Sequence, residues 1–317
     1  MTDIWQQITM KSMKNQNKIS IIGCGNVGMT AAYSILHKGD VDELVLFGRN
    51  KQALIGEELD LEHGLSFLST AKITAADTFD ALEGSDVIVY TAGAAQKPGE
   101  TRLDLTKKNV AILEGMIPEI VKHAPDAVIL IVANPVDILT YKAYVAAGLP
   151  KGRIFGSGTT LDTARFRFHL SQFMNVHPRS IHAYVLGEHG DHSFPALSNA
   201  NIGGQNLNEF PNFTEEKALR SYQKARTAAY KIIESKGATY YAIGADISSI
   251  VSTILKDKRS VLAVSIPLHN YYGLNGVALS VPCIVGRNGV EQVLKANLSS
   301  HEQKLLQRAA AALKEYL

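Results

Sequence analysis

The sequence predicts an α/β fold in which a doubly wound, mostly parallel sheet is followed by a second, α+β domain. In the first half of the 317 residues, short apolar runs alternate with longer helical patterns, which is typical of βαβ units. Residues 128–132 are apolar without alternation, as expected of a central parallel strand covered on both faces. A glycine-rich turn directly follows the first apolar run.

The elements of the first half follow from these alternating patterns. Strands are expected at 18–23, 43–47, 71–75, 86–92, 127–133 and 153–156. Helices are expected between them at 27–37, 51–62, 103–123 and 135–147. This rhythm indicates a parallel sheet with helices on both of its faces.

The second half has a mixed, partly antiparallel pattern, which indicates an α+β domain. Helices are expected at 162–173, at 214–256 with a break near 236–237, and at 299–316. Strands are expected at 180–186, 196–202, 261–267 and 276–285. The predicted division is an amino-terminal arm over 1–17, a first domain over 18–157 and a second over 158–317.

Composition limits the possible partners. The chain has 32 basic and 30 acidic residues, and this balance gives no reason to expect nucleic acid or a membrane as partner. It contains no apolar run of membrane-spanning length, and its arm lacks an apolar signal core. The two cysteines, Cys24 and Cys283, are too few to suggest a disulfide framework. We therefore expect a cytoplasmic protein without a metal site.

The glycine turn lies at the first β-α junction of the predicted sheet. Gly23 permits a tight turn, Gly25 lets the backbone approach a pyrophosphate, and Gly28 lets the helix pack close to the sheet. The N–H groups at the start of that helix, near Asn26 and Val27, then face the phosphates. This context favours a Rossmann-type dinucleotide site, with a glycine-rich turn that binds no ligand as the alternative.

The end of the second strand departs from the usual dinucleotide pattern. An acidic residue normally stands there and bonds the ribose 2′-hydroxyl of NAD, but this chain has Gly48 and Arg49. A 2′-phosphate would meet no carboxylate there and could pair with Arg49. NADP use is therefore plausible, and the alternative is that Arg49 is a solvated loop charge and NAD binds.

Three side chains of the second half are suited to reducing a 2-keto acid. Asp162 and Arg165 lie one turn apart on a predicted helix and share a face, and His189 sits between glycines after a strand. An imidazole can protonate a ketone oxygen near neutral pH, and a carboxylate can fix its tautomer. A guanidinium can hold a substrate carboxylate through two hydrogen bonds. The alternatives are an ordinary intrahelical ion pair and a surface histidine.

Two segments at the carboxyl end of the predicted sheet complete the candidate site. Residues 91–109 are expected to form a loop that closes over the ligand, excludes water and carries Arg102 to the reacting oxygen. A solvated loop is the alternative. Asn134, which ends the next strand, can hydrogen-bond near the nicotinamide or the substrate oxygen, or can simply turn the chain before Pro135.

These segments resemble the L-lactate/malate dehydrogenase family over nearly the whole chain, from about Lys18 to Leu317. The resemblance is carried by the glycine turn, the Ala-Asn-Pro-Val-Asp run at 133–137, Leu-Asp-x-Ala-Arg at 161–165 and Gly-Glu-His-Gly-Asp at 187–191. Within the family, the chain resembles the bacterial L-lactate branch. The resemblance implies NAD as cofactor and the reversible reduction of pyruvate to L-lactate.

The resemblance also implies a role for each candidate residue. His189 would give and accept the proton, Asp162 would orient it, and Arg102 would polarise the ketone and stabilise charge on its oxygen. The implied substrate contacts are Arg165, Gln96, Asn134 and Thr239. The implied coenzyme contacts are Gly23, Gly25, Asn26, Val27, Gly28, Gly48, Arg49, Ala92, Gly93, Asn134, Ser157 and Ile243.

Gln96 occupies the loop position at which malate dehydrogenases of the family carry an arginine for the second substrate carboxylate. A neutral side chain would leave that carboxylate unpaired, so pyruvate is favoured over oxaloacetate. A dehydrogenase of malate or another L-2-hydroxy acid remains the alternative enzyme. A non-enzymatic dinucleotide sensor is the other alternative, but it has no need for His189, Asp162, Arg165 and Arg102 together.

Arg167 and His182 match the positions through which bacterial lactate dehydrogenases bind fructose 1,6-bisphosphate across a subunit interface. Basic groups suit such a ligand. The alternatives are an exposed helix arginine and a histidine packed at an interface. The resemblance further implies a homotetramer.

Overall fold

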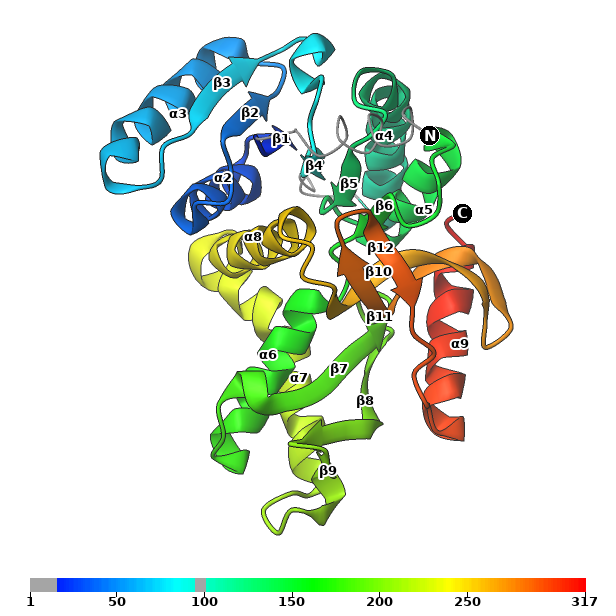
Figure 1. The fold of residues 1–317 in the computed structure, drawn as a ribbon. Helices are drawn as coiled ribbons and strands as arrows, with labels where there is room; N and C mark the ends of the chain where they lie inside the picture. The colour runs from blue at the N-terminus through cyan, green and yellow to red at the C-terminus, as the bar shows by residue number, and fades with distance from the viewer. Residues whose placement is uncertain (1–15, 95–100) are drawn as a thin grey trace, which may run out of the picture.

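The computed structural model describes residues 16–94 and 101–317 (Figure 1). The strands of the first half pair in parallel in the order β3-β2-β1-β4-β5-β6, which is that of a doubly wound nucleotide-binding sheet. These strands are β1 (Lys18–Ile22), β2 (Glu43–Phe47), β3 (Lys72–Ala76), β4 (Val87–Tyr90), β5 (Val128–Ile131) and β6 (Ile154–Gly156). The helices between them are α2 (Asn26–Lys38), α3 (Lys51–Gly64), α4 (Arg102–His123) and α5 (Val136–Ala147).

The second half adds antiparallel strands to the same sheet, because β10 pairs with β6 and the order continues through β11, β7, β8 and β9. The strands are β7 (Ile181–Gly187), β8 (Ser193–Ile202), β9 (Gln205–Asn206), β10 (Ser260–Tyr271), β11 (Leu274–Gly286) and β12 (Gly289–Val293). The helices are α6 (Thr160–Met174), α7 (Glu215–Lys236), α8 (Tyr241–Leu255) and α9 (Ser300–Lys314). The predicted fold class, a Rossmann-type sheet followed by a partly antiparallel α/β region, is confirmed.

Several predicted boundaries were wrong. The loop expected over 91–109 ends early, because α4 begins at Arg102 behind a capping box in which Thr101 and Asp104 bond each other's backbone N–H. The strands β10 and β11 are longer than expected, because they continue past the polar residues at which the apolar pattern stops. They meet at a tight turn of Tyr272 and Gly273, which both have positive φ. The strand β9 was missed because it has only two residues, and β12 was missed because Glu291 and Gln292 interrupt its apolar pattern.

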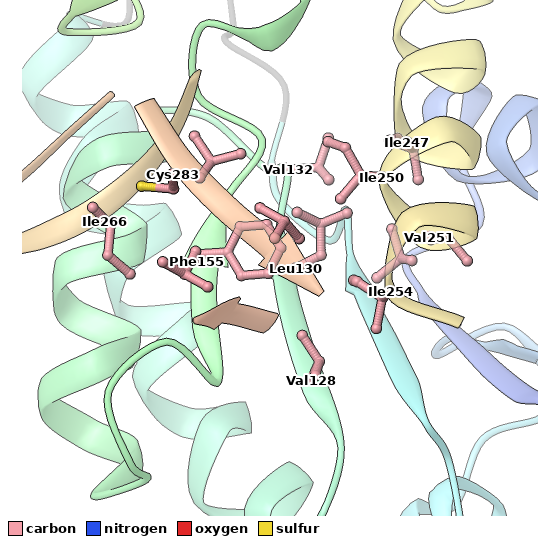
Figure 2. Close-up of a cluster of buried hydrophobic side chains, with 14 of the residues drawn as sticks. Val128, Leu130, Val132, Phe155, Ile247, Ile250, Val251, Ile254, Ile266 and Cys283 are labelled. Atoms are coloured by element: carbon pink, nitrogen blue, oxygen red, sulfur yellow. The ribbon is translucent and has the colours of Figure 1, made fainter. Parts of the chain in front are cut away.

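The strand β5 shows why the sheet needs an unbroken apolar run. Val128 and Leu130 belong to the core cluster that includes α8, and Figure 2 shows them on that side of the sheet. The intervening Ile129 and Ile131 belong to a second cluster on the opposite face, with residues of α4 and α5. Both faces of the strand are therefore covered, as the sequence predicts.

The helix α8 joins the two halves by packing along α2 (Figure 1). A Cβ placed on Gly244 would approach Thr30 Cγ2 to 2.5 Å, so the two helices meet too closely there for a larger residue. One turn further, Ser248 Oγ donates a hydrogen bond to the carbonyl oxygen of Ser34 at 3.0 Å. Across residues 16–94 and 101–317, no helix combines the length and the apolar character needed to cross a membrane.

Candidate active site

Within the glycine turn, backbone packing requires a glycine at two positions but not at the third. Gly23 has φ +95°, and a Cβ there would lie 2.5 Å from the backbone nitrogen of Ala92. A Cβ on Gly28 would lie 2.1 Å from the carbonyl oxygen of Gly23. A Cβ on Gly25 would meet no described protein atom within 4 Å. Packing therefore explains Gly23 and Gly28, whereas the absence of a side chain at Gly25 leaves room for a ligand.

The amino terminus of α2 suits a phosphate group. Gly25 is the N-cap residue, and within the described chain no side chain caps this helix and no acidic residue stands in its first turn. The backbone N–H groups near Asn26 and Val27 are then available to an anion, which the helix dipole also favours. The residues present therefore fit the pyrophosphate of a dinucleotide, although the structure contains no ligand.

The strand β2 is followed by Gly48, Arg49 and Asn50, so these three residues supply no carboxylate. Gly48 donates its N–H to the carbonyl oxygen of Ala76 at 3.1 Å, and Arg49 is exposed. A Cβ on Gly48 would lie 3.6 Å from Leu54 Cδ1, which is an ordinary contact. The backbone could therefore carry a side chain at position 48 without strain.

Asn109, which the sequence analysis missed, ties together the loops that follow β4 and β5. Its Nδ2 donates to the carbonyl oxygen of Asn134 at 2.8 Å, and its Oδ1 accepts from the N–H of Ala94 at 2.8 Å. Asn109 is buried on α4. These two hydrogen bonds position the candidate coenzyme residues Ala92, Gly93 and Asn134 at the carboxyl edge of the sheet. The only sequence signal for it was a polar residue on the buried side of a helix.

The structure brings Asp162, Arg165 and His189 together. Asp162 lies between the other two: its Oδ2 is 2.7 Å from His189 Nδ1, and its Oδ1 accepts from an Arg165 guanidinium nitrogen at 3.1 Å. The first two residues lie on α6 and His189 lies directly after β7, so the fold joins segments that are far apart in the sequence. The His189 side chain is 28% exposed, which leaves it open to a ligand.

Asp137 is a second carboxylate behind the histidine, and the sequence analysis assigned it no role. Its Oδ2 accepts the backbone N–H of His189 at 2.6 Å, and its Oδ1 accepts the hydroxyl of Ser265 at 2.5 Å. Asp137 is 3% exposed. It fixes the backbone that carries the imidazole, while Asp162 fixes the ring.

The two carboxylates set the proton affinity of the histidine. Burial alone would lower the pKa of His189, but the charge and hydrogen bond of Asp162, together with the charge of Asp137, raise this pKa to about 9. Burial would raise the pKa of Asp162, but His189 and Arg165 hold it below its usual value. The pKa of Asp137 is raised by burial to about 6, against the hydrogen bonds from Ser265 and His189. At neutral pH, His189 is therefore protonated and Asp162 is ionised.

The remaining candidate residues lie at or near the ends of strands and helices. Ser157 is buried at the end of β6, where its N–H donates to the carbonyl oxygen of Ile131. Ile243 is partly buried against the core at the start of α8, and Thr239 is partly buried just before that helix. Gln96 lies outside the described residues. Arg102 is the first residue of α4 rather than part of the preceding loop.

The candidate effector residues also lie near each other. Arg167 Nε donates to the carbonyl oxygen of Ala183 at 2.8 Å, and its guanidinium lies over the ring of Tyr184. His182 is exposed on β7 and precedes Ala183, the residue that Arg167 bonds, and the register between β7 and β8 is irregular from His182 to Tyr184.

The fold and the cluster together define a class of protein. A dinucleotide-binding sheet whose carboxyl edge lies beside an imidazole–carboxylate pair and a guanidinium is that of a nicotinamide-dependent oxidoreductase. Sequence profiles give the family: the lactate/malate dehydrogenase NAD binding domain matches residues 17–156. The lactate/malate dehydrogenase alpha/beta C-terminal domain matches residues 159–317. The chain belongs to the lactate/malate dehydrogenase family.

Individual relatives agree with this assignment. The L-lactate dehydrogenase of Thermoanaerobacterium saccharolyticum is 47% identical over 306 residues, which cover 95% of this chain and 98% of that protein. L-lactate dehydrogenase 1 of Clostridium acetobutylicum is 44% identical over 310 residues, covering 96% and 99%. The ligand-bound structure of the minor L-lactate dehydrogenase of Enterococcus mundtii superposes with a TM-score of 0.92 at 37% identity, covering 96% and 98%.

Proposed function

We propose that the protein is an L-lactate dehydrogenase, which reduces pyruvate to L-lactate with a reduced nicotinamide dinucleotide and catalyses the reverse reaction. The observation that carries this proposal is the 2.7 Å contact between His189 and Asp162 beside Arg165, in a chain whose first β-α turn suits a dinucleotide. The full-length similarity to L-lactate dehydrogenases supports it. The division into a coenzyme domain over 18–157 and a substrate domain over 158–317 is part of the same proposal.

The proton in this reaction is held and moved by His189. Because Nδ1 bonds Asp162, its N–H points at the carboxylate, and Nε2 is the ring nitrogen left to meet a substrate. That nitrogen gives its proton to the ketone oxygen of pyruvate. A reduced nicotinamide, when bound, would supply the hydride to the keto carbon. The imidazole left behind is neutral, and it recovers a proton readily because Asp162 and Asp137 favour its charged form.

Arg165 holds the substrate. One guanidinium nitrogen bonds Asp162 Oδ1, so the fork is fixed relative to the histidine, and its other N–H groups can bind the pyruvate carboxylate. The remaining proposed contacts follow the family resemblance. Arg102 stabilises charge on the reacting oxygen, Asn134 assists there, and Thr239 borders the methyl group. Ser157 and Ile243 border the nicotinamide.

Gln96 is proposed to select pyruvate, and this defines the experiment that tests the function. Wild-type protein is expected to reduce pyruvate with a higher kcat/KM than oxaloacetate or 2-oxoisocaproate. The Gln96→Arg variant supplies a partner for the second carboxylate, so its oxaloacetate-to-pyruvate ratio of kcat/KM is expected to rise about 10- to 100-fold. The measurement is the loss of reduced-coenzyme absorbance. An unchanged ratio would remove Gln96 from the specificity argument, and a wild-type preference for another 2-keto acid would replace the proposed substrate.

A nicotinamide dinucleotide is the cofactor, and we propose NAD with tolerance of NADP. The Gly48→Asp substitution restores the missing carboxylate, and the ordinary 3.6 Å contact with Leu54 indicates that its Cβ fits. Because a carboxylate repels a 2′-phosphate, the variant is expected to lose NADPH activity about tenfold more than NADH activity. The ratio of kcat/KM for the two coenzymes measures this effect. Equal responses would mean that position 48 does not contact the ribose.

We also propose a cytoplasmic homotetramer that is activated by fructose 1,6-bisphosphate. The free thiols Cys24 and Cys283 agree with a reducing compartment. The proposed effector site rests on the family resemblance and on the neighbouring positions of Arg167 and His182. The pyruvate assay repeated with and without fructose 1,6-bisphosphate decides this point: activation that an Arg167→Gln variant lacks supports it, and an unchanged rate removes it.

A further inference from the structure

Asp246 is an acidic residue of α8, a helix that contacts the helix carrying Asp162 and Arg165. We call Asp162, Arg165 and His189 the reacting cluster. It lies two residues from both Gly244 and Ser248, the positions at which α8 meets α2. Two residues correspond to about 200° of rotation around a helix, so Asp246 lies on the side of α8 turned away from α2. The helix α6, which carries Asp162 and Arg165, also contacts α8.

The carboxylate of Asp246 is not paired as buried carboxylates usually are. Its Oδ2 is enclosed and has no hydrogen-bond partner within residues 16–94 and 101–317. Among the buried side-chain oxygens and nitrogens of these residues, Thr140 Oγ1 is the only other atom without a partner. The charged groups that act on it are Asp162 and Arg165 from α6, His189 from the segment after β7, and Lys38 from α2. Three of these four groups belong to the reacting cluster.

We propose that Asp246 is a positioning residue for proton transfer: its negative charge, on a helix that contacts the helix of Asp162, strengthens the hold of His189 on its proton. This inference rests on the proposed function, in which that proton goes to the substrate. No direct contact between Asp246 and the substrate is required, because two charges separated by several ångströms inside a protein still interact appreciably.

The protonation state of Asp246 changes near neutral pH. Burial, followed by the charge of Asp162, raises the pKa of Asp246 to about 7, whereas His189, Arg165 and Lys38 oppose this rise. The pKa of His189 is about 9. On raising the pH, Asp246 therefore loses its proton first, and its charge then delays the loss of the proton from His189. Below pH 7, Asp246 is neutral and has no such effect.

The Asp246→Asn variant tests the proposal through the pH profile of pyruvate reduction. Removing the charge is expected to shift the basic limb of the pH profile of log(kcat/KM) to lower pH by about 0.5 to 1 pH unit. Activity at pH 6 is expected to stay within about twofold of wild type. An Asp246→Glu variant, which keeps the charge, is expected to restore part of the shift. The matched control is Glu216→Gln, which removes one negative charge from an exposed pair with Arg220.

A direct titration of His189 separates this proposal from the proposed function. Histidine-selective NMR of the protein without substrate, with His189→Asn used to assign the signal, gives the pKa of the imidazole in wild type and in Asp246→Asn. A lower pKa in the variant supports the proposal even if pyruvate is not the substrate. An unchanged pKa, or an equal fall in Glu216→Gln, overturns it. If Asp246→Asn does not fold, Asp246→Ser is titrated in the same way, with the same two outcomes.

Discussion

Substituting asparagine for Asp162 is expected to lower kcat for pyruvate reduction by about 10²- to 10⁴-fold. The amide cannot provide the negative charge that now lies 2.7 Å from His189 Nδ1, and it can favour the wrong tautomer of the ring. Burial, which lowers the pKa of His189, then acts with less opposition. The imidazole is therefore expected to be mostly neutral at pH 7 and unable to supply the proton.

The pH profile distinguishes this mechanism from general damage to the fold. In the wild type, His189 carries its proton up to about pH 9, so pyruvate reduction loses its proton donor only as the pH rises through that value. In Asp162→Asn, the same loss is expected at least two pH units lower. The same change at exposed Asp126 is the control and should leave the profile unmoved. A folded Asp162 variant with a normal profile would contradict the assigned role.

The Arg165→Lys substitution is expected to lower kcat/KM for pyruvate by about 10²- to 10⁴-fold, mainly through a higher KM. Lysine keeps the positive charge but lacks the planar fork, so it cannot bond Asp162 and both oxygens of a substrate carboxylate as Arg165 can. Steady-state kinetics at saturating coenzyme separates KM from kcat.

The exposed Arg220, which pairs with Glu216 on the surface of α7, provides the matched control for Arg165→Lys. The Arg220→Lys variant is expected to retain wild-type kinetics. An Arg165→Lys variant with an unchanged KM would show that the substrate carboxylate binds elsewhere, and the position of Arg165 beside Asp162 would then have only a structural purpose.

The parts of the molecule that could be predicted from the sequence are those with local signals. The glycine turn follows an apolar run directly, and the alternation of strands and helices identifies the sheet before any contact is known. Asp162 and Arg165 are one helical turn apart, so their shared face follows from the period alone. The meeting of His189 with this pair was an expectation from chemistry and family resemblance, because their segments come together only through the tertiary fold.

The residues that were missed have partners far away in the sequence. Asp137 bonds the backbone of a residue 52 positions later, and Asn109 bonds one 25 positions later. Asp137 ends the run at 133–137 that carries the family resemblance, but nothing in that run shows which group it bonds. Asn109 and Asp246 look like single polar residues in helical patterns. The ends of β10 and β11 were misplaced for a related reason. Exposed His269, Asn270 and Asn275 interrupt the apolar pattern there, although the two strands remain paired out to Tyr271 and Leu274.

The close packing of Gly244 on Thr30 has a consequence for how the enzyme works. Because α8 packs on α2, and β10 continues the sheet beyond β6, separating the two halves of the chain would break both contacts. We therefore expect the proton donor and the anion-binding arginine to keep their places relative to the sheet when the coenzyme leaves. Each catalytic cycle begins with these groups already aligned, and the binding energy of the next substrate need not be spent on reassembling them.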